Sequence, residues 1–145
     1  RENGTLTISG ALRNVFTAPV AERLAAGLPL IVKIRFELSR DVPLGPDKKL
    51  AQVTAVRTAT WDRLRQEYLF SEDGPAGAMQ RTTRDRSELQ ALVCDLKHVQ
   101  IIPTSRLKPG SHFYVRVQAQ VQNEKPALPI DRLLFFILPS SSSHG

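Results

Sequence analysis

The chain has 145 residues and an apolar content of 41%, the size and composition of a single globular domain with one hydrophobic core. It carries 20 Lys and Arg against 14 Asp and Glu, a net charge of +6, and its single cysteine excludes an intramolecular disulfide. The most apolar run, Leu133 to Leu138, is far shorter than the about 20 residues of a transmembrane helix. We therefore expect one domain, residues 1–139, followed by a flexible serine-rich tail at residues 140–145.

The first part of the chain predicts a strand, a short helix and a second strand. Gly4–Leu12 forms the first strand, with a bulge or bend at its internal glycine. A two-turn helix begins at Thr17 or Ala18, with a proline in its first turn, and stops at Gly27. Leu30–Ser39 alternates apolar and other residues, which is typical of a half-buried strand.

The middle of the chain predicts a hairpin. Its arms are Leu50–Trp61 and Arg65–Ser71, joined by a turn at residues 62–64. In the first arm the odd-numbered residues share one face, and Arg57 is among them. Glu72–Gly77 is expected to be a loop, with the adjacent acids Glu72 and Asp73 facing solvent.

After this loop the apolar period changes from two to about 3.6, which predicts a second helix, Ser87–Leu96, with Ser87 as its cap. A short strand, Val99–Pro103, follows. The turn Pro109-Gly110 leads into a strictly alternating strand, Phe113–Val121, and Asp131–Leu138 is a strand or a helical turn. About seven strands and two short helices in this order predict a mainly β fold, an antiparallel β-sandwich.

The sequence has no recognisable catalytic pattern. It lacks the GxSxG elbow of serine hydrolases and the glycine-rich loops that bind phosphates. Of the histidines, His112 starts a strand as an exposed edge residue, and His144 follows Ser140–Ser143 in the tail. We therefore expect no enzyme and no cofactor, with no catalytic, cofactor-binding or metal-binding residues.

Cys94 and His98 have the spacing that places two metal ligands on one face of a helix. The alternative is a small buried thiol beside the apolar stripe, and we favour it because the helix is expected to end near Leu96. A Cys-His nucleophile pair would also need an orienting third group, which the sequence does not offer. Whether Cys94 is reactive stays open.

Two further patterns have both a binding and a packing interpretation. Trp61 and Tyr68 on the two hairpin arms form either a ligand platform or an aromatic packing pair, and we favour packing. Small residues leave room for a cavity between the sheet and the second helix, although natural cores use alanine routinely. These residues are Ala55, Ala59, Ala91 and Ala119.

The positive charge is spread along the chain. Four cations fall on expected strands: Lys33, Arg35, Arg57 and Arg116. We interpret them as the solvated face of a sheet. The densest run, Arg81, Arg84 and Arg86, is interrupted by Asp85, is followed by Glu88 and has no aromatic platform beside it. We therefore expect no specific nucleic-acid partner, only weak attraction.

Three motifs together resemble those of a known family. They are Gly27-Leu28-Pro29-Leu30, then Leu64 with Tyr68, and finally Leu107, Gly110 and Tyr114 to Val117. Through them the chain, from Gly4 to about Leu138, resembles a family of exported proteobacterial proteins known only as a domain of unknown function. The resemblance implies a periplasmic or envelope location, a gene often near a membrane sensor kinase, and no known activity. The basic balance and the serine tail depart from that family.

A complete scaffold without a catalytic set, together with this resemblance, predicts a non-enzymatic, exported β-sandwich. We expect it to bind another protein as an interaction or signalling accessory in the bacterial envelope, close to the membrane, through an edge strand. The alternative is a carrier of a small apolar ligand or lipid; a nucleic-acid-binding module is the third option. The chain begins at Arg1 rather than Met, which fits removal of a signal peptide, loss of a membrane anchor or an omitted segment. The oligomeric state stays open.

Overall fold

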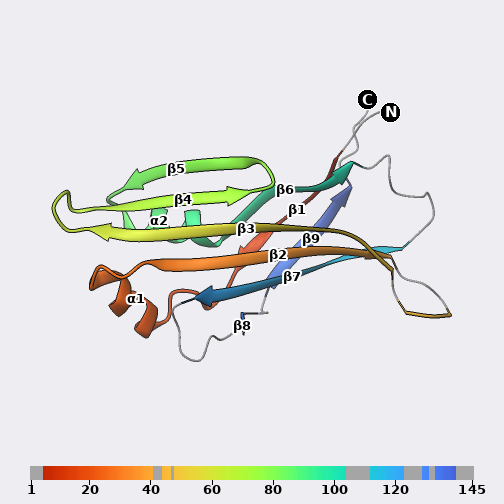
Figure 1. Cartoon of the computed structure of the whole chain (residues 1–145), viewed down its shortest axis with the longest axis horizontal. Helices are drawn as coiled ribbons and strands as arrows, with labels where there is room; N and C mark the ends of the chain where they lie inside the picture. The colour runs from red at the N-terminus through yellow and green to blue at the C-terminus, as the bar shows by residue number, and fades with distance from the viewer. Residues whose placement is uncertain are drawn as a thin grey trace.

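Two antiparallel sheets make up most of the computed structural model, which describes residues 5–40, 44–46, 48–103, 112–122, 129–130 and 133–139. In chain order the elements are β1 (Thr5–Leu12), α1 (Ala18–Ala25), β2 (Leu30–Arg40), β3 (Lys48–Asp62), β4 (Glu67–Gly74), β5 (Gly77–Thr83), α2 (Arg86–Cys94), β6 (Asp95–Pro103), β7 (Phe113–Gln122), β8 (Pro129–Ile130) and β9 (Leu133–Pro139) (Figure 1). The larger sheet has six strands in the order β5-β4-β3-β2-β7-β8, and the smaller has three in the order β6-β1-β9.

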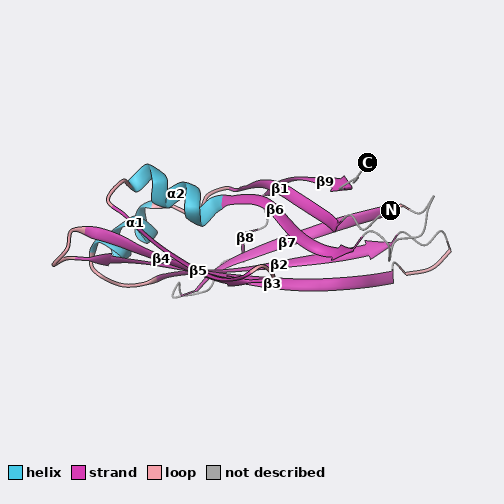
Figure 2. Cartoon of the chain, turned by 90° about the horizontal axis from the view of Figure 1, so that it is seen from above, coloured by secondary structure: helices cyan, strands magenta, loops and turns pink. Residues whose placement is uncertain are grey.

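The two sheets lie in two layers (Figure 2). Both helices lie on the same side of the six-stranded sheet as the three-stranded sheet, so the described elements leave its other face uncovered. The fold is mainly β, an antiparallel sandwich with two short helices, as the sequence predicts. The described part has nine strands rather than about seven, because the prediction missed β5 and the two-residue β8.

The core lies between the layers and uses the faces that the alternation predicts. Ile34 on β2 stands between Ala55 on β3 and Ala119 on β7, so a large side chain is flanked by two small ones. From the other layer, Ile8 and α2's Leu89 are also fully buried in this cluster. Ala55 and Ala119 therefore belong to a packed core.

Helix α1 begins and ends where the sequence predicts. The Thr17 side chain accepts a hydrogen bond from the Val20 amide at 3.4 Å, which caps the N-terminus. After the helix, Gly27 adopts a φ of +91° and donates to the Leu24 carbonyl, while the Leu28 amide donates to the Arg23 carbonyl at 2.9 Å. This pair of bonds is a Schellman motif, and the left-handed backbone explains why glycine occupies the position.

Several predicted boundaries in the middle of the chain were wrong, among them the end of the second helix, which lies at Cys94 and not at Leu96 because β6 begins at Asp95. Glu72–Gly77 is not a loop: β4 continues to Gly74, and only Pro75 and Ala76 separate it from β5. Strand β5 escaped prediction because it is an edge strand that is mostly exposed and polar, without apolar alternation. Helix α2 is capped by the Asp85 carboxylate, which accepts from the Ser87 amide at 2.9 Å, so Ser87 is not the cap.

Toward the C-terminus, the open choice for Asp131–Leu138 resolves to a strand, β9. The irregularity expected at the internal glycine of β1 is present as a register shift between Ile8 and Gly10 in its pairing with β6. The predicted turn at 109–110 and the tail at 140–145 lie outside the described residues. Neither of the described helices has the length and apolar character needed to span a bilayer.

Candidate functional site

A groove of about 450 Å³ opens between the inner face of the six-stranded sheet and the segment formed by α2 and β6. Its walls are mostly apolar and include Phe36, Ala55, Met79, Ala91, Leu92 and Val99. The turn between β4 and β5 closes one side with Pro75 and Ala76. The cavity expected between the sheet and the second helix is therefore present and is lined by Ala55 and Ala91, whereas Ala59 and Ala119 are buried in the core and do not line it.

The groove lies beside edge strands of the two sheets. Among the described strands, β5 is one edge of the larger sheet, with β8 at the other, and β6 is an edge of the smaller one. An edge strand presents backbone N–H and C=O groups that the sheet does not use. The groove is therefore bordered by backbone that can pair with another extended segment.

Arg57 lies in the groove wall and is only 6% exposed. Its Nη1 atom donates to the carbonyl oxygens of Val93 at 2.8 Å and Asp95 at 2.7 Å. The first of these carbonyls belongs to the last turn of α2, where helix C=O groups lack intrahelical partners and attract cations. Arg57 thus joins the larger sheet to the junction of α2 and β6, and its expected place on a solvated face was wrong.

Glu72 supplies the charge partner of Arg57. Its Oε2 atom lies 3.5 Å from Arg57 Nε, which is buried and has no hydrogen bond. The Glu72 side chain is 21% exposed, on β4, so its expected place as a solvent-facing loop acid was also wrong. The pair is a structural contact: two carbonyl oxygens and one carboxylate hold the guanidinium in the wall of the groove.

The other acids of the groove are held in place or lie at its rim. The Thr83 hydroxyl donates to Glu88 at 2.5 Å and accepts from the Asp85 amide at 3.0 Å, which ties β5 to the first turn of α2. Asp95 and Lys97 line the groove from β6. No three acidic, histidine or cysteine side chains gather as a metal site within the described part of the chain.

Cys94 and His98 do not share a helix. Cys94 is the last residue of α2, and His98 lies in β6, which starts at the next residue. The helical spacing on which the half-site depended is therefore absent. Burial, with a further contribution from the Asp95 carboxylate, raises the pKa of the Cys94 thiol to about 11. The thiol is partly buried and packs against the core, as the favoured interpretation predicts.

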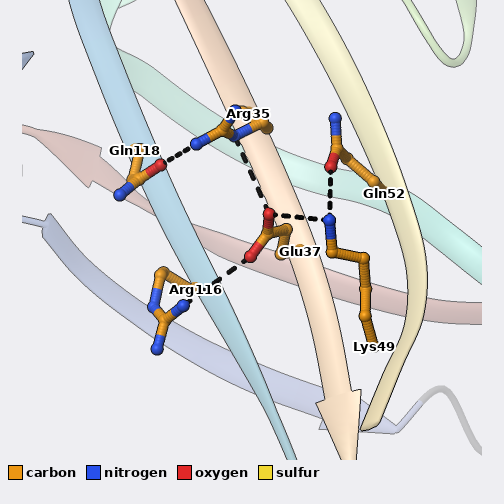
Figure 3. A network of polar contacts seen from close by, with 6 residues as sticks. All are labelled: Arg35, Glu37, Lys49, Gln52, Arg116 and Gln118. Carbon is orange, nitrogen blue, oxygen red and sulfur yellow. Dashed lines mark hydrogen bonds and ion pairs between the residues drawn. The ribbon is translucent and has the colours of Figure 1, made fainter.

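The outer face of the six-stranded sheet carries a second cluster of charges (Figure 3). Glu37 on β2 lies 3.2 Å from Lys49 Nζ, 3.7 Å from Arg116 Nη1 and 4.0 Å from Arg35 Nε. Arg35 also donates to the side-chain oxygen of Gln118 on β7. One carboxylate therefore holds three cations from three neighbouring strands. The sequence predicted a solvated face for Arg35 and Arg116, and the alternation of β2 places Glu37 on the face of Arg35, but no local pattern indicates that Lys49 and Arg116 pair with Glu37.

The remaining candidates are dispersed. Arg81 lies on β5, while Arg84 and Arg86 flank the capping residue of α2, and all three are exposed. The rings of Trp61 and Tyr68, directly opposite on β3 and β4, are 4.6 Å apart and tilted by 53°. This geometry suits an aromatic packing pair, and Tyr68 also packs against the core. His112 is exposed just before β7, as predicted.

Comparison with known proteins gives a family. The model of that family, described as "Domain of unknown function (DUF4390)", matches residues 1–141, nearly the whole chain. Among curated proteins and among solved structures, none matches the chain. Because the family model covers far more than half of the sequence, the chain belongs to the DUF4390 family.

Proposed function

We propose that this domain is a non-enzymatic protein-interaction module of the bacterial envelope, where it acts as an accessory to signalling. The observation that supports this proposal is the mostly apolar groove beside the free edge of β5. An extended segment of a partner can pair with the backbone of β5 and place alternate side chains against the groove wall. Main-chain pairing then provides affinity, and the groove provides selectivity.

The edge itself has a feature that favours a selective partner. Arg81 lies on the inner face of β5, opposite Phe70 in the register with β4, and is exposed. A charged side chain at this position of an edge strand opposes indiscriminate pairing with other chains. A partner segment with a hydrogen-bond acceptor opposite Arg81 compensates this charge. The edge of β5 therefore favours pairing with such segments over segments that lack an acceptor.

The envelope location and the link to signalling rest on the resemblance to exported proteobacterial proteins whose genes often lie near a membrane sensor kinase. Cell fractionation followed by immunoblotting for the native protein tests the location. Recovery in the periplasmic or membrane fraction supports the proposal, whereas recovery in the cytosol alone contradicts it.

The interaction is tested by blocking the groove. Ala91 is exposed on α2 and lines the groove, so Ala91→Trp fills the opening without placing the new side chain in the core. We expect partners captured from envelope extracts by cross-linking to be lost with this variant. Ala25→Trp, at the exposed end of α1 and away from the groove, is the matched control and should retain them. Equal capture by both variants would remove the groove from the proposal.

A second candidate is a carrier of a small apolar ligand or lipid, and the volume of the groove favours it. At about 450 Å³ it falls within the range of about 300–1,000 Å³ that small-molecule sites occupy. Titration with a fluorescent fatty acid distinguishes the two functions. Saturable binding that Ala91→Trp abolishes supports a carrier, and a linear, unsaturated response contradicts it.

A further inference from the structure

We propose that the outer face of the six-stranded sheet is a second docking surface, which binds an acidic, carboxylate-rich segment of a partner protein. We call this surface the cationic face. It consists of Glu37, the three cations that pair with it (Arg35, Lys49 and Arg116) and Lys33, four residues before Glu37 on β2. It lies on the opposite side of the sheet from the groove, so it does not depend on the function proposed for the groove.

The cations of this surface are accessible. The side chains of Arg35, Lys49 and Arg116 are 47%, 55% and 58% exposed, whereas Glu37 at their centre is only 15% exposed. Lys33, two residues before Arg35 on the same face of β2, is also exposed. Both described helices and the smaller sheet lie on the other side of the six-stranded sheet, so none of these elements covers the cations (Figures 2 and 3).

The cationic face has too few carboxylates for its cations. Three cations pair with Glu37 and Lys33 lies farther along the same face of β2, which leaves a net charge of +3 on the five residues. The register places three other acids of the described strands on the outer face. Asp62 and Glu67 pair with each other at the far end of β3 and β4, and Asp73 on β4 is separated from Lys33 by Val56. Like charges held on one surface repel one another, so added carboxylates are attracted to it.

The geometry favours an extended acidic chain. Side chains two residues apart on a strand are about 6.8 Å apart, and neighbouring strands are about 4.8 Å apart, so the cations form a flat array. An extended peptide has the same spacing between alternate side chains. Three exposed glutamines on β7, Gln118, Gln120 and Gln122, continue the face beside Lys33 and Arg35 and offer amide donors to carboxylates and backbone carbonyls.

Two other anionic partners fit less well. Binding to a bilayer surface is strengthened by apolar side chains that enter the lipid. The exposed large apolar residues of the described part are Leu28, Leu44, Leu64 and Leu69. Of these, Leu69 alone occupies an outer-face position of the sheet, on β4, two strands away from β2. Single-stranded nucleic acid uses a series of aromatic rings on which successive bases stack, whereas the described strands place one aromatic residue beside these cations, Tyr114, two residues before Arg116 on β7.

The test uses a fluorescein-labelled synthetic peptide of alternating Glu and Ser, titrated by fluorescence anisotropy against the whole chain at low and high salt. The double variant Lys33→Gln/Arg116→Gln should weaken binding about fivefold or more, given the modest strength of exposed ion pairs. Arg84→Gln/Arg86→Gln removes the same charge from exposed residues near the start of α2 and should change the affinity less than about twofold.

Glu37→Gln provides the opposite readout. It removes the acid that competes with the peptide for the three cations, so we expect binding about threefold tighter than that of the unmodified protein. The amide spectrum of each variant must show a folded chain. Ala91→Trp, which blocks the groove, should leave peptide binding unchanged, so failure of either proposal is seen separately.

Three results would overturn the inference. Equal losses for the two double variants would mean that the peptide follows net charge and not this surface. Phosphatidylglycerol vesicles and a single-stranded oligonucleotide are added in turn as competitors of the peptide. If either one binds more tightly than the peptide and its binding depends on Lys33 and Arg116, the surface belongs to that other class of partner. Absence of peptide binding at low salt would also reject the proposal.

Discussion

The two faces of the six-stranded sheet each hold a cluster of charges, and the clusters have opposite compositions. On the inner face one cation, Arg57, is surrounded by acceptors: Glu72 and two carbonyl oxygens. On the outer face one carboxylate, Glu37, is surrounded by three cations. In the inner cluster the cation has enough acceptors, and these contacts stabilise the fold. In the outer cluster the cations outnumber the carboxylate, so they can bind carboxylates of a partner.

The difference follows from the surroundings of each cluster. A charge removed from water must be paired and hydrogen-bonded, because its desolvation costs several kcal/mol, about 3–5 kcal/mol when one partner of a buried pair is removed. An exposed ion pair contributes only about 0–1 kcal/mol, since water and salt screen it. Substitutions in the inner cluster should therefore affect stability, and those in the outer cluster should affect binding.

The largest effect is expected at Arg57. Arg57→Met keeps much of the side-chain volume but removes the bonds to Val93 and Asp95 and leaves Glu72 without its cation. We expect a loss of about 3 kcal/mol in the free energy of unfolding, measured by urea denaturation and nearly independent of salt. Arg35→Met on the outer face is the control and should lose less than about 1 kcal/mol. A loss below about 1 kcal/mol for Arg57→Met would refute the contrast between the faces.

Cys94, next to one of the carbonyls that Arg57 binds, reports on the same interior. With its pKa raised to about 11, far less of the thiol is ionised at pH 8 than in an unfolded chain. We expect alkylation by iodoacetamide at pH 8, followed by mass spectrometry, to be at least about tenfold slower in the folded protein than in urea. Comparable rates in the two states would show that this region opens readily.

The same shift sets the sign of a pH effect. The folded state holds the Cys94 proton more tightly than the unfolded state, so the stabilising contribution of this thiol is present at neutral pH. It should decline as the pH rises from the free value of about 8.5 towards 11. Cys94→Ala should reduce this decline. An identical pH dependence in both proteins between those values would contradict the assignment.

Gly74 tests how tightly the inner face is packed beside Glu72. A Cβ atom at this position would lie 3.1 Å from the Ala55 Cβ and 3.4 Å from Glu72 Oε2. Gly74→Ala should therefore cost about 1 kcal/mol in thermal or urea unfolding, because neighbours must shift to admit it. Ala76→Ser, exposed in the same turn, should change stability by less than about 0.5 kcal/mol.

The smallest effect on stability is expected at Glu37. Glu37→Gln should lower the free energy of unfolding by about 0.5 kcal/mol at low salt, and high salt should remove most of the difference. Urea denaturation at two salt concentrations measures this. A loss as large as that of Arg57→Met, unaffected by salt, would mean that the outer cluster is structural.

Sequence patterns predicted the faces of the long strands better than the partners of their side chains. In β2 and β7 the alternation predicted the buried residues because one face of each strand meets the core along its whole length. In β3 the same rule placed Arg57 on the face of Ala55 and Ala59, yet the residue was interpreted as solvated. Its acceptors, Val93 and Asp95, are 36 and 38 residues away in the chain, and no local pattern reveals them.

The candidate sites were predictable only in part. The groove was expected between the sheet and the second helix. Part of its wall, however, comes from the hairpin of β4 and β5, which the sequence did not predict because its turn at Pro75 and Ala76 indicated a longer loop. The cationic face brings β2, β3 and β7 together, and the register that aligns Glu37 with Gln52 and Arg116 is set by the fold as a whole. Apolar period alone does not fix such cross-strand neighbours.

The topology of the smaller sheet has a consequence for how the chain folds. Strand β1 lies between β6 and β9, and its Thr7 pairs with Leu138 near the other end of the described chain. The hairpins of β3, β4 and β5 pair strands that are neighbours in the sequence. In contrast, β1 pairs with β9, which follows it by more than a hundred residues. Closing such a loop costs entropy before any contact compensates it, which slows folding. Until β9 pairs with it, β1 has an unpaired edge. During synthesis the chain therefore passes through a stage in which its first strand can pair with other chains.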